Sequence, residues 1–346
     1  GVYVTTRCKI NNSLTMKYSF IIPIYNRPDE LDELLQSLTA QQYNDDFEVV
    51  VVDDGSPQPL EAICLRYPLM DISYYRKANT GPGDSRNYGM QQAKHDYFII
   101  LDSDCIVPPH YLATVDAYLR SHYVDCFGGA DAANAQFTDI QKAINYAMTS
   151  LLTTGGIRGN KRRIQRFEPR SFNMGLSRRA FEATKGFKRI HPGEDPDLVI
   201  RLWGAGFETA FIPDAYVYHK RRISWGKFRV QVNKFGQTRA ILNYWHPHTR
   251  KLTFWFPTLF SIGFLVAIIA LFMGFSFFWW CYMAYFTIIY IDSALKNRSL
   301  VIGTLTLWAV LLQFFSYGIG FLWATLKIFL VKKPVEVLFP KLFFEF

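Results

Sequence analysis

Short apolar runs alternate with amphipathic segments between residues 18 and 101. The runs are typical of buried parallel strands, and the segments between them have helical spacing. The expected strands are Tyr18–Ile24, Phe47–Val52, Ile72–Arg76 and Tyr97–Leu101, and the expected helices are Asp29–Gln41, Pro59–Tyr67 and Gly83–Ala93. This alternation predicts an α/β domain with a mostly parallel sheet that helices cover on both faces.

The second half of the chain has long apolar stretches instead. Leu252–Ile291 holds forty residues without a charge, enough for two membrane spans of about twenty residues each, with a turn near Phe275 and Ser276. After a polar break at Asp292–Arg298, Ser299–Leu326 is again uncharged. Together with 50% hydrophobic and 17% aromatic residues, this pattern predicts a multi-pass membrane protein with a water-soluble front domain.

The number of spans stays open between three and four. Ser299–Leu326 has the length of one span, which gives three. Basic residues prefer the cytosolic side of a membrane. Those that flank the apolar stretches are Arg250, Lys251, Lys296, Arg298, Lys332 and Lys333. All would be cytosolic if the last segment turned back at Ser316–Gly320, so charge favours a returning or re-entrant segment.

An aromatic and basic segment, Ser224–Trp245, joins the two halves. Its apolar residues recur at three-and-four spacing with Lys and Arg among them, which is typical of a helix at a membrane interface. Because it adjoins the long apolar stretch, anionic lipid heads suit it better than nucleic acid does. We therefore attribute much of the net charge of +9 to contact with a membrane surface and expect no nucleic-acid partner.

These patterns divide the chain into five parts. We expect an N-terminal extension or expression remnant at 1–15, the α/β domain at 16–222, the interfacial helix at 223–251, the transmembrane region at 252–331 and a tail at 332–346. Gly1–Tyr18 has no apolar central region of the kind a signal peptide needs. The five cysteines show neither paired nor metal-ligand spacing, as expected for a front domain in the reducing cytosol.

Polar residues collect where the predicted strands end. Asp102-Ser103-Asp104 closes the fourth strand, Asp53-Asp54-Gly55-Ser56 the second, and Pro23 to Arg27 the first. Ligands of open α/β sheets bind at this edge. Two carboxylates can hold a hard divalent cation, Asp53 can accept a hydrogen bond from the imide of uracil, and Tyr25 can stack on a base. Taken alone, each of the two acidic motifs is more typical of a solvated turn.

A glycine-rich segment, Asn79–Asn87, is superficially like a dinucleotide-binding fingerprint. Arg86 replaces its third glycine, and it follows the third strand rather than the first, which argues against a Rossmann dehydrogenase. Backbone N–H groups at the start of the next helix can still face a phosphate, with Arg86 one turn further on.

Together these motifs resemble the family 2 inverting glycosyltransferases of GT-A fold. The resemblance covers about residues 18 to 222, and two further motifs carry it, Gly193-Glu194-Asp195 and Tyr218-His219. It implies a nucleotide site at Pro23, Tyr25, Arg27, Asp53, Gly81, Arg86, Asp102 and Ser103, a metal site for Mn²⁺ or Mg²⁺ at Asp102, Asp104 and His219, and catalysis by Asp195 beside Glu194. Asp84-Ser85 departs from the family, which usually has small apolar residues there.

Three of these features have plain structural alternatives. The acidic residues after Gly193 could cap an amphipathic helix that continues through Leu198 and Leu202. His219 could be a structural histidine. The basic run after Gly159, which includes Arg162 and Arg163, could be a solvated surface or could clamp an acceptor phosphate.

We interpret the chain as an inverting, metal-dependent glycosyltransferase anchored in the inner membrane and facing the cytosol. Its donor would be a nucleotide-sugar, with a UDP-sugar favoured, and its acceptor a lipid or lipid-linked saccharide of the cell envelope. A polyprenyl-phosphate glycosyl synthase is the alternative enzyme, and a non-catalytic nucleotide-sugar-binding membrane protein is the alternative outside enzymes. A processive polysaccharide synthase is disfavoured because no Gln-x-x-Arg-Trp element is found, and a transporter because Leu252–Ile291 has no charge.

Overall fold

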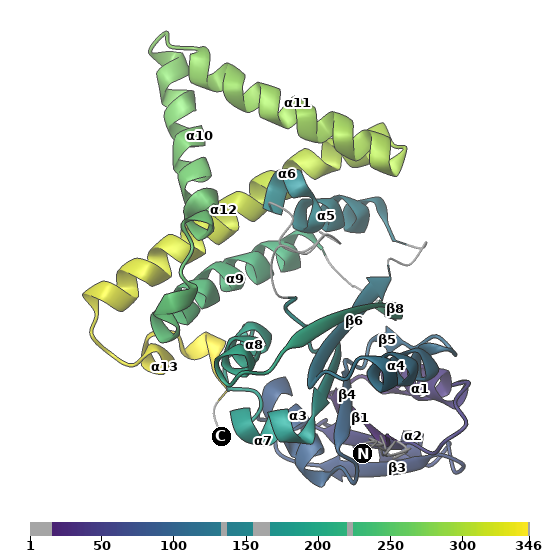
Figure 1. Cartoon of the computed structure of the whole chain (residues 1–346). Coiled ribbons are helices and arrows are strands. Elements are labelled where there is room, and N and C mark those ends of the chain that lie inside the picture. Colours follow the sequence, from purple (N-terminus) through teal and green to yellow (C-terminus); the bar gives the residue numbers. More distant parts are fainter. Residues whose placement is uncertain (1–15, 133–136, 155–166, 220–223, 345–346) are drawn as a thin grey trace, which may run out of the picture.

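One eight-stranded sheet organises the first part of the chain in the computed structural model, which describes residues 16–132, 137–154, 167–219 and 224–344 (Figure 1). The strands are β1 (Tyr18–Ile24), β2 (Glu48–Asp53), β3 (Asp71–Arg76), β4 (Tyr97–Leu101), β5 (Cys105–Ile106), β6 (Cys126–Ala132), β7 (Asn173–Ser177) and β8 (Thr209–His219). Their order is β3-β2-β1-β4-β7-β6-β8-β5. Neighbours from β3 to β4 pair in parallel, whereas β7 is antiparallel to both β4 and β6, so the predicted mostly parallel sheet is confirmed.

Helices cover both faces of this sheet, as the sequence pattern predicts. The helices of this part are α1 (Pro28–Thr39), α2 (Glu61–Cys64), α3 (Pro82–Gln92), α4 (Tyr111–Ser121), α5 (Asp139–Thr149), α6 (Leu151–Thr154), α7 (Arg178–Thr184) and α8 (Glu194–Gly204). The strands expected first and fourth have the predicted bounds, and the three helices expected between the strands are present with shifted ends.

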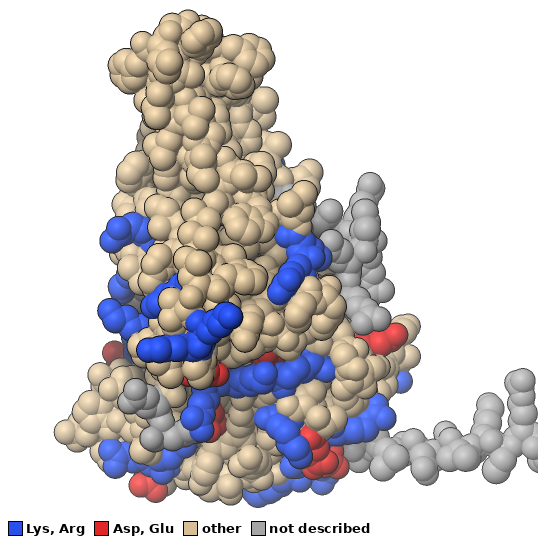
Figure 2. Space-filling view, turned by 90° about the vertical axis from the view of Figure 1, so that its left-hand side faces the viewer, with Lys and Arg blue, Asp and Glu red and all other residues tan. Residues whose placement is uncertain are grey.

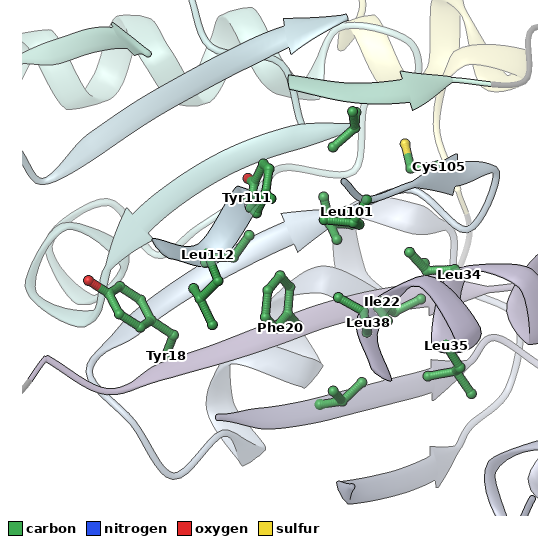
Figure 3. Close-up of a cluster of buried hydrophobic side chains, with 14 of the residues drawn as sticks. Tyr18, Phe20, Ile22, Leu34, Leu35, Leu38, Leu101, Cys105, Tyr111 and Leu112 are labelled. Carbon is green, nitrogen blue, oxygen red and sulfur yellow. The ribbon is translucent and has the colours of Figure 1, made fainter. Parts of the chain in front are cut away.

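The sheet separates two apolar cores because neighbouring side chains of a strand point to opposite faces. Phe20 and Ile22 of β1 pack against the leucines of α1, and Figure 3 shows this cluster, in which Tyr111 and Leu112 of α4 also lie. On the other face, Ile21 joins side chains of α3, α7 and α8. Both faces of β1 and β2 are therefore dry, which explains why these strands are apolar throughout.

A second, helical part follows the α/β domain. It contains α9 (Trp225–Trp245), α10 (Phe256–Phe272), α11 (Phe277–Asn297), α12 (Leu300–Leu330) and α13 (Val335–Leu338), with short 3-10 turns η1 (Pro247–Thr249), η2 (Leu252–Trp255) and η3 (Pro340–Leu342). Two stretches, Leu252–Phe272 and Leu300–Leu330, are long and apolar enough to cross a membrane. Figure 2 shows this part as a column whose visible upper portion carries no charged residue, while Lys and Arg gather near its base. The turn expected near Phe275 and Ser276 is present between α10 and α11.

The turn expected at Ser316–Gly320 is wrong, because α12 runs through it without a break. These residues are small because two other helices cross α12 here. A Cβ on Gly318 would lie 2.9 Å from the Pro257 carbonyl oxygen of α10, and a Cβ on Gly320 would lie 2.4 Å from the Asn233 carbonyl oxygen of α9. The glycines therefore allow close helix packing, which is a common use of small residues in membrane helices.

The helical part contacts the α/β domain and α5 at several places along α12. In the middle of α12, Gln313 Nε2 donates to the Ala147 carbonyl of α5 at 3.0 Å, and Asp292 near the end of α11 accepts a hydrogen bond from Tyr146. Near the C-terminal end of α12, Lys327 Nζ donates to the Leu338 carbonyl at 2.8 Å. In Figure 1, α12 runs beside α9 while α10 and α11 form a projecting hairpin.

The apolar stripe of α9 is covered by other helices. Phe228 and Val232 pack with Phe314 of α12, and Ile241 packs with Phe321. The stripe that predicted an interfacial helix is therefore an interior surface of the helical part. Contact of α9 with a membrane stays a prediction, and it now rests on the basic residues of this helix alone.

A segment after α12 returns to the α/β domain. We call residues 340–344 the C-terminal strap. Phe343 forms an antiparallel bridge with Ile190, the Leu342 carbonyl accepts from the His191 backbone at 2.8 Å, and the Phe344 ring lies 5.9 Å from the His191 ring. The predicted tail thus packs beside the predicted site through its described residues.

Candidate functional site at the sheet edge

The loop after β2 is held from two sides by its own carboxylates. Asp53 is fully buried, and its two oxygens accept from the Ser56 backbone at 2.8 Å and from the Tyr74 hydroxyl at 2.6 Å. Asp54 accepts from Lys77 Nζ at 2.6 Å and from the Gly81 backbone at 2.9 Å. Asp53 thus braces its turn with both of its oxygens.

A second contact joins the loop after β1 to the acidic turn after β4. Glu30 of α1 accepts from Arg27 Nη1 at 3.2 Å and from the Ser103 hydroxyl at 3.5 Å. Tyr25, in the same loop, is 49% exposed, so its ring is accessible for stacking. The site residues expected from these two loops therefore lie at one edge, and Pro23 lies within β1 in register with Val52 of β2.

Arg86 links the two acidic motifs of the site. Its Nη2 lies 2.7 Å from Asp102 Oδ1, its Nη1 lies 3.3 Å from Glu194 Oε1, and only 4% of its side chain is exposed. Burial acts to lower the pKa of Arg86, but the two carboxylates raise it further above its ordinary value. The sequence assigned Arg86 to the nucleotide, whereas here its guanidinium ties the turn after β4 to the start of α8.

Gly193 is the N-cap of α8 and has a φ of 127°. The two carboxyl groups that follow it, those of Glu194 and Asp195, have pKa values shifted in opposite directions. Burial acts to raise the pKa of Glu194, but His191 and Arg86 lower it to about 2. His191 Nδ1 lies 2.9 Å from Glu194 Oε1. For Asp195, burial and then the charge of Glu194 raise the pKa, against the lowering effect of Arg86 and Arg170.

Asp195 is the better base of this pair. Its Oδ2 accepts from the Ser171 backbone at 3.2 Å, and its enclosed Oδ1 has no hydrogen-bond partner within the described part of the chain. Two neighbouring carboxylates whose pKa values are driven apart are a common sign of distinct catalytic roles. The expected capping is not a side-chain cap: Glu194 Oε2 accepts from the Gly193 backbone at 2.9 Å, but none of the described side chains caps α8, and its acidic first turn favours the helix only through the dipole.

The acidic turn fits a divalent cation by its donor chemistry. Asp102 and Asp104 offer carboxylate oxygens two residues apart, as Mn²⁺ and Mg²⁺ prefer. Strand β5, directly after the turn, pairs with β8 so that Cys105 stands opposite His219. The His219 side chain lies outside the described residues, and among those described no cluster of three acidic, cysteine or histidine residues could already hold a metal.

The basic run and Gly81 were also expected near this edge. Arg162 and Arg163 of the basic run lie outside the described residues. Gly81 is the N-cap of α3 with a φ of 96°, and the Phe344 ring occupies the space that its side chain would fill.

Three site residues were missed by the sequence reasoning. Asp54 stands inside a turn motif, Glu30 falls at the start of an expected helix without further signal, and His191 carries no signal besides its place three residues before Glu194. Only the contacts between distant segments reveal their roles.

Comparison with known proteins gives one family match and several partial relatives. Residues 19–184 match the glycosyl transferase family 2 model. Relatives include the poly(ribitol-phosphate) beta-N-acetylglucosaminyltransferase TarS of Staphylococcus aureus, 34% identical over 114 residues, which are 32% of this chain and 20% of that protein. Chondroitin synthase of Pasteurella multocida is 44% identical over 89 residues, 25% of this chain and 9% of that protein.

The curated relatives are much longer than the region they share with this chain: the matched region covers 20% of TarS and 30% of an uncharacterised glycosyltransferase of Rickettsia typhi. Among solved structures, the mannosyltransferase PcManGT of Pyrobaculum calidifontis, in complex with GDP-Man and Mn²⁺, has a TM-score of 0.56 and 16% identity, over 88% of this chain and 87% of that one. This likeness supports the GT-A fold.

Proposed function

We propose that this chain, whose residues 19–184 match the glycosyl transferase family 2 model, is an inverting, metal-dependent glycosyltransferase. It would move a sugar from a UDP-sugar to a lipid or lipid-linked acceptor at the cytosolic face of a membrane. The observation that carries this proposal is the carboxylate of Asp195, with a raised pKa and an unpartnered Oδ1 beside the clamped Glu194.

Asp195 would remove the proton of the attacking acceptor hydroxyl. A single base suffices when the acceptor oxygen attacks the anomeric carbon from the face opposite the nucleotide, and this displacement inverts the configuration. Glu194 remains ionised and holds Arg86, so its role is to position rather than to transfer a proton.

Asp102 and Asp104, with His219 on the neighbouring strand, would hold Mn²⁺ or Mg²⁺. When bound, the cation neutralises charge that develops on the departing diphosphate. Tyr25 and Asp53 would contact the base, and we favour uridine because an imide N–H can donate to a carboxylate.

The helical part supports a membrane location. The α10–α11 hairpin exposes Leu265, Ile269, Phe272, Phe277, Trp280 and Ile288. Such a large exposed apolar surface marks a membrane or protein contact. With α12 lying beside α9, we infer that this hairpin enters the bilayer and that the α/β domain stays on the side of the basic residues, which is the cytosolic side.

The proposal is tested with the purified full chain in detergent. UDP- and GDP-sugars are supplied with and without Mn²⁺ together with a lipid extract, and sugar transfer to lipid is measured. We expect transfer from a UDP-sugar that requires the cation. Asp195→Asn should lower kcat by about 10² to 10⁴ while the affinity for UDP is unchanged. Asp214→Asn, an exposed carboxylate on β8, is the control.

Retained transfer in Asp195→Asn would contradict the assignment of the base. It would favour the alternative enzyme, a polyprenyl-phosphate glycosyl synthase, because an ionised phosphate acceptor attacks without a base.

A further inference from the structure

We propose that His246, the residue that follows α9, is a positioning residue for the proposed base: through Asp197 it fixes the first turn of α8 and with it the direction of the Asp195 carboxylate. The inference rests on the proposed function, because it takes Asp195 as the group that removes the acceptor proton. His246 acts on the turn that carries the base rather than on a reacting atom.

The carboxylate of Asp197 lies two residues after the proposed base and is fully buried. Its Oδ2 accepts from Arg201 Nε at 2.8 Å, and its Oδ1 accepts from His246 Nε2 at 2.8 Å. The ammonium group of Lys188 lies 3.6 Å from the same Oδ1. Since an ionised carboxylate can only accept, Nε2 of His246 carries the proton in this contact. These partners compensate the buried charge of Asp197 and fix the orientation of its carboxylate.

Asp197 and the proposed base belong to one helical turn. The Asp197 backbone N–H donates to the Gly193 carbonyl at 3.2 Å, which closes the first turn of α8 around the base. His246 holds the far end of this turn, and Thr238 holds the peptide before it, because the Thr238 hydroxyl donates to the Pro192 carbonyl at 2.7 Å. Thr238 lies in α9 and His246 directly follows this helix, so one helix holds the base-bearing turn at both ends.

His246 is itself held through both of its backbone groups. It is the C-cap residue of α9, and its N–H donates to the Leu242 carbonyl at 2.8 Å. Its carbonyl accepts from the Thr249 hydroxyl at 2.8 Å. Only 13% of the His246 side chain is exposed. An imidazole held in this way determines where Asp197 lies, whereas a mobile side chain would only follow it.

Arg201, the other close partner of Asp197, has a different role. Its Nη1 donates to the Thr184 carbonyl at 2.6 Å and its Nη2 to the Gly186 carbonyl at 2.7 Å, so it ties α8 to the end of α7. Arg201 also stays paired with Asp197 when His246 is replaced. Loss of His246 therefore leaves no unpaired buried charge, and we expect a folded protein whose base is displaced.

The test compares sugar transfer by His246→Asn and His246→Gln, in the purified full chain in detergent with UDP-sugars and a lipid extract. The Gln amide nitrogen can take the place of Nε2 and reach Asp197, whereas the Asn side chain is shorter by a methylene group and cannot. In His246→Asn we expect kcat per folded chain to fall about tenfold to 10²-fold while the KM for the donor is unchanged. His246→Gln should recover most of this loss. His248→Asn, at an exposed histidine of η1, is the control and should keep the wild-type kcat.

A double-mutant cycle separates positioning of the base from a general structural role. If His246 acts through Asp195, His246→Asn should have no further effect on kcat in the Asp195→Asn background, where no base remains to be positioned. Radiolabelled donor makes the residual transfer of Asp195→Asn measurable. A purely structural role predicts the same loss in both backgrounds. Equal losses, or a kcat of His246→Asn equal to that of the wild type, would overturn the inference.

Hydrogen exchange needs no substrate and tells failure of this inference apart from failure of the proposed function. Amide exchange in residues 194–197 should be faster in His246→Asn than in the wild type and in His246→Gln. Full transfer by Asp195→Asn would refute the base and would leave this exchange pattern as it is. The same exchange in all three chains would refute the link between His246 and α8, whatever the activity.

Discussion

Arg86 Nη2 lies 2.7 Å from Asp102 Oδ1, so a buried guanidinium on α3 fixes one carboxylate of the acidic turn after β4. The same guanidinium holds Glu194 at the start of α8. Three segments that carry separate motifs in the sequence are thereby joined at one charged group. The distance between the expected cation site and the expected base therefore depends on Arg86.

Replacing Arg86 with Met should destabilise the protein by about 3–5 kcal/mol, because two carboxylates would lose their buried partner. Arg66→Met is the control, since it removes an exposed pair with Asp32 that is worth at most about 1 kcal/mol. Thermal unfolding of the detergent-solubilised chain measures both. Equal Tm values for the two variants would contradict a linking role for Arg86.

Protonation of His191 should stabilise the fold through Glu194. The pKa of His191 is raised because the attraction of Glu194 outweighs the effect of burial. The stabilisation is therefore complete below pH 6.5, the unfolded value, and is lost as pH rises through the higher folded value. Because 44% of the side chain is exposed, the contribution is at most about 1 kcal/mol.

The measurement for His191 is the Tm difference between wild type and His191→Gln across this pH range. The difference should be largest below pH 6.5 and shrink at higher pH. His122→Gln, at the exposed end of α4, should show no such trend. A difference that grows with pH would refute the pairing.

Gly81→Ala should cost more stability than Gly206→Ala. Both glycines have a positive φ, 96° and 86°, so a side chain is strained by about 1–2 kcal/mol in either place. Only at Gly81 would the new Cβ also meet the Phe344 ring, at 2.3 Å, whereas nothing lies within 4 Å of the Cβ position at Gly206. Adding Phe344→Ala should remove the excess, as unfolding curves of the single and double variants will show.

Gly236→Ala should weaken the contact between α9 and α12. Its Cβ would lie 2.3 Å from the Tyr317 carbonyl oxygen, an overlap that typically costs about 1–3 kcal/mol. Gly226→Ala, in the first turn of the same helix, meets nothing within 4 Å and should be neutral or slightly stabilising. Thermal unfolding compares the two, and equal effects would show that helix propensity rather than packing decides.

Four of the eight strands, β1 to β4, could be predicted from the sequence because their apolar residues form short local runs. Strands β5 to β8 were not predicted, since Gly and polar residues interrupt such segments as Cys126–Ala132. Tyr18–Ile24 and Tyr97–Leu101 are buried at every position, so their pattern needs no distant information. The position of the site also followed from parallel pairing, which places the carboxyl ends of β1, β2 and β4 at one edge of the sheet. The loops after these strands meet there.

The links within that edge could not be predicted in the same way. Arg86 was assigned to a nucleotide because its position in the first turns of α3, as the fifth residue, suggests a phosphate, whereas its partners come from two distant segments. An apolar stripe like that of α9 is expected both for a helix on a membrane surface and for a helix packed against another helix. Only the observed packing against α12 distinguishes the two cases. Gly318 and Gly320 likewise suggest a break in the helix until the helices that cross α12 at these positions are known.

The C-terminal strap has a practical consequence for how this protein can be divided into fragments. A fragment truncated ahead of α9 would lose Phe343 from its bridge with Ile190 and Thr238 from its hydrogen bond to Pro192. The peptide that precedes Glu194 would then have neither of these supports. Catalytic parameters obtained on such an excised domain would therefore describe a loosened centre, and assays should retain the residues through 344.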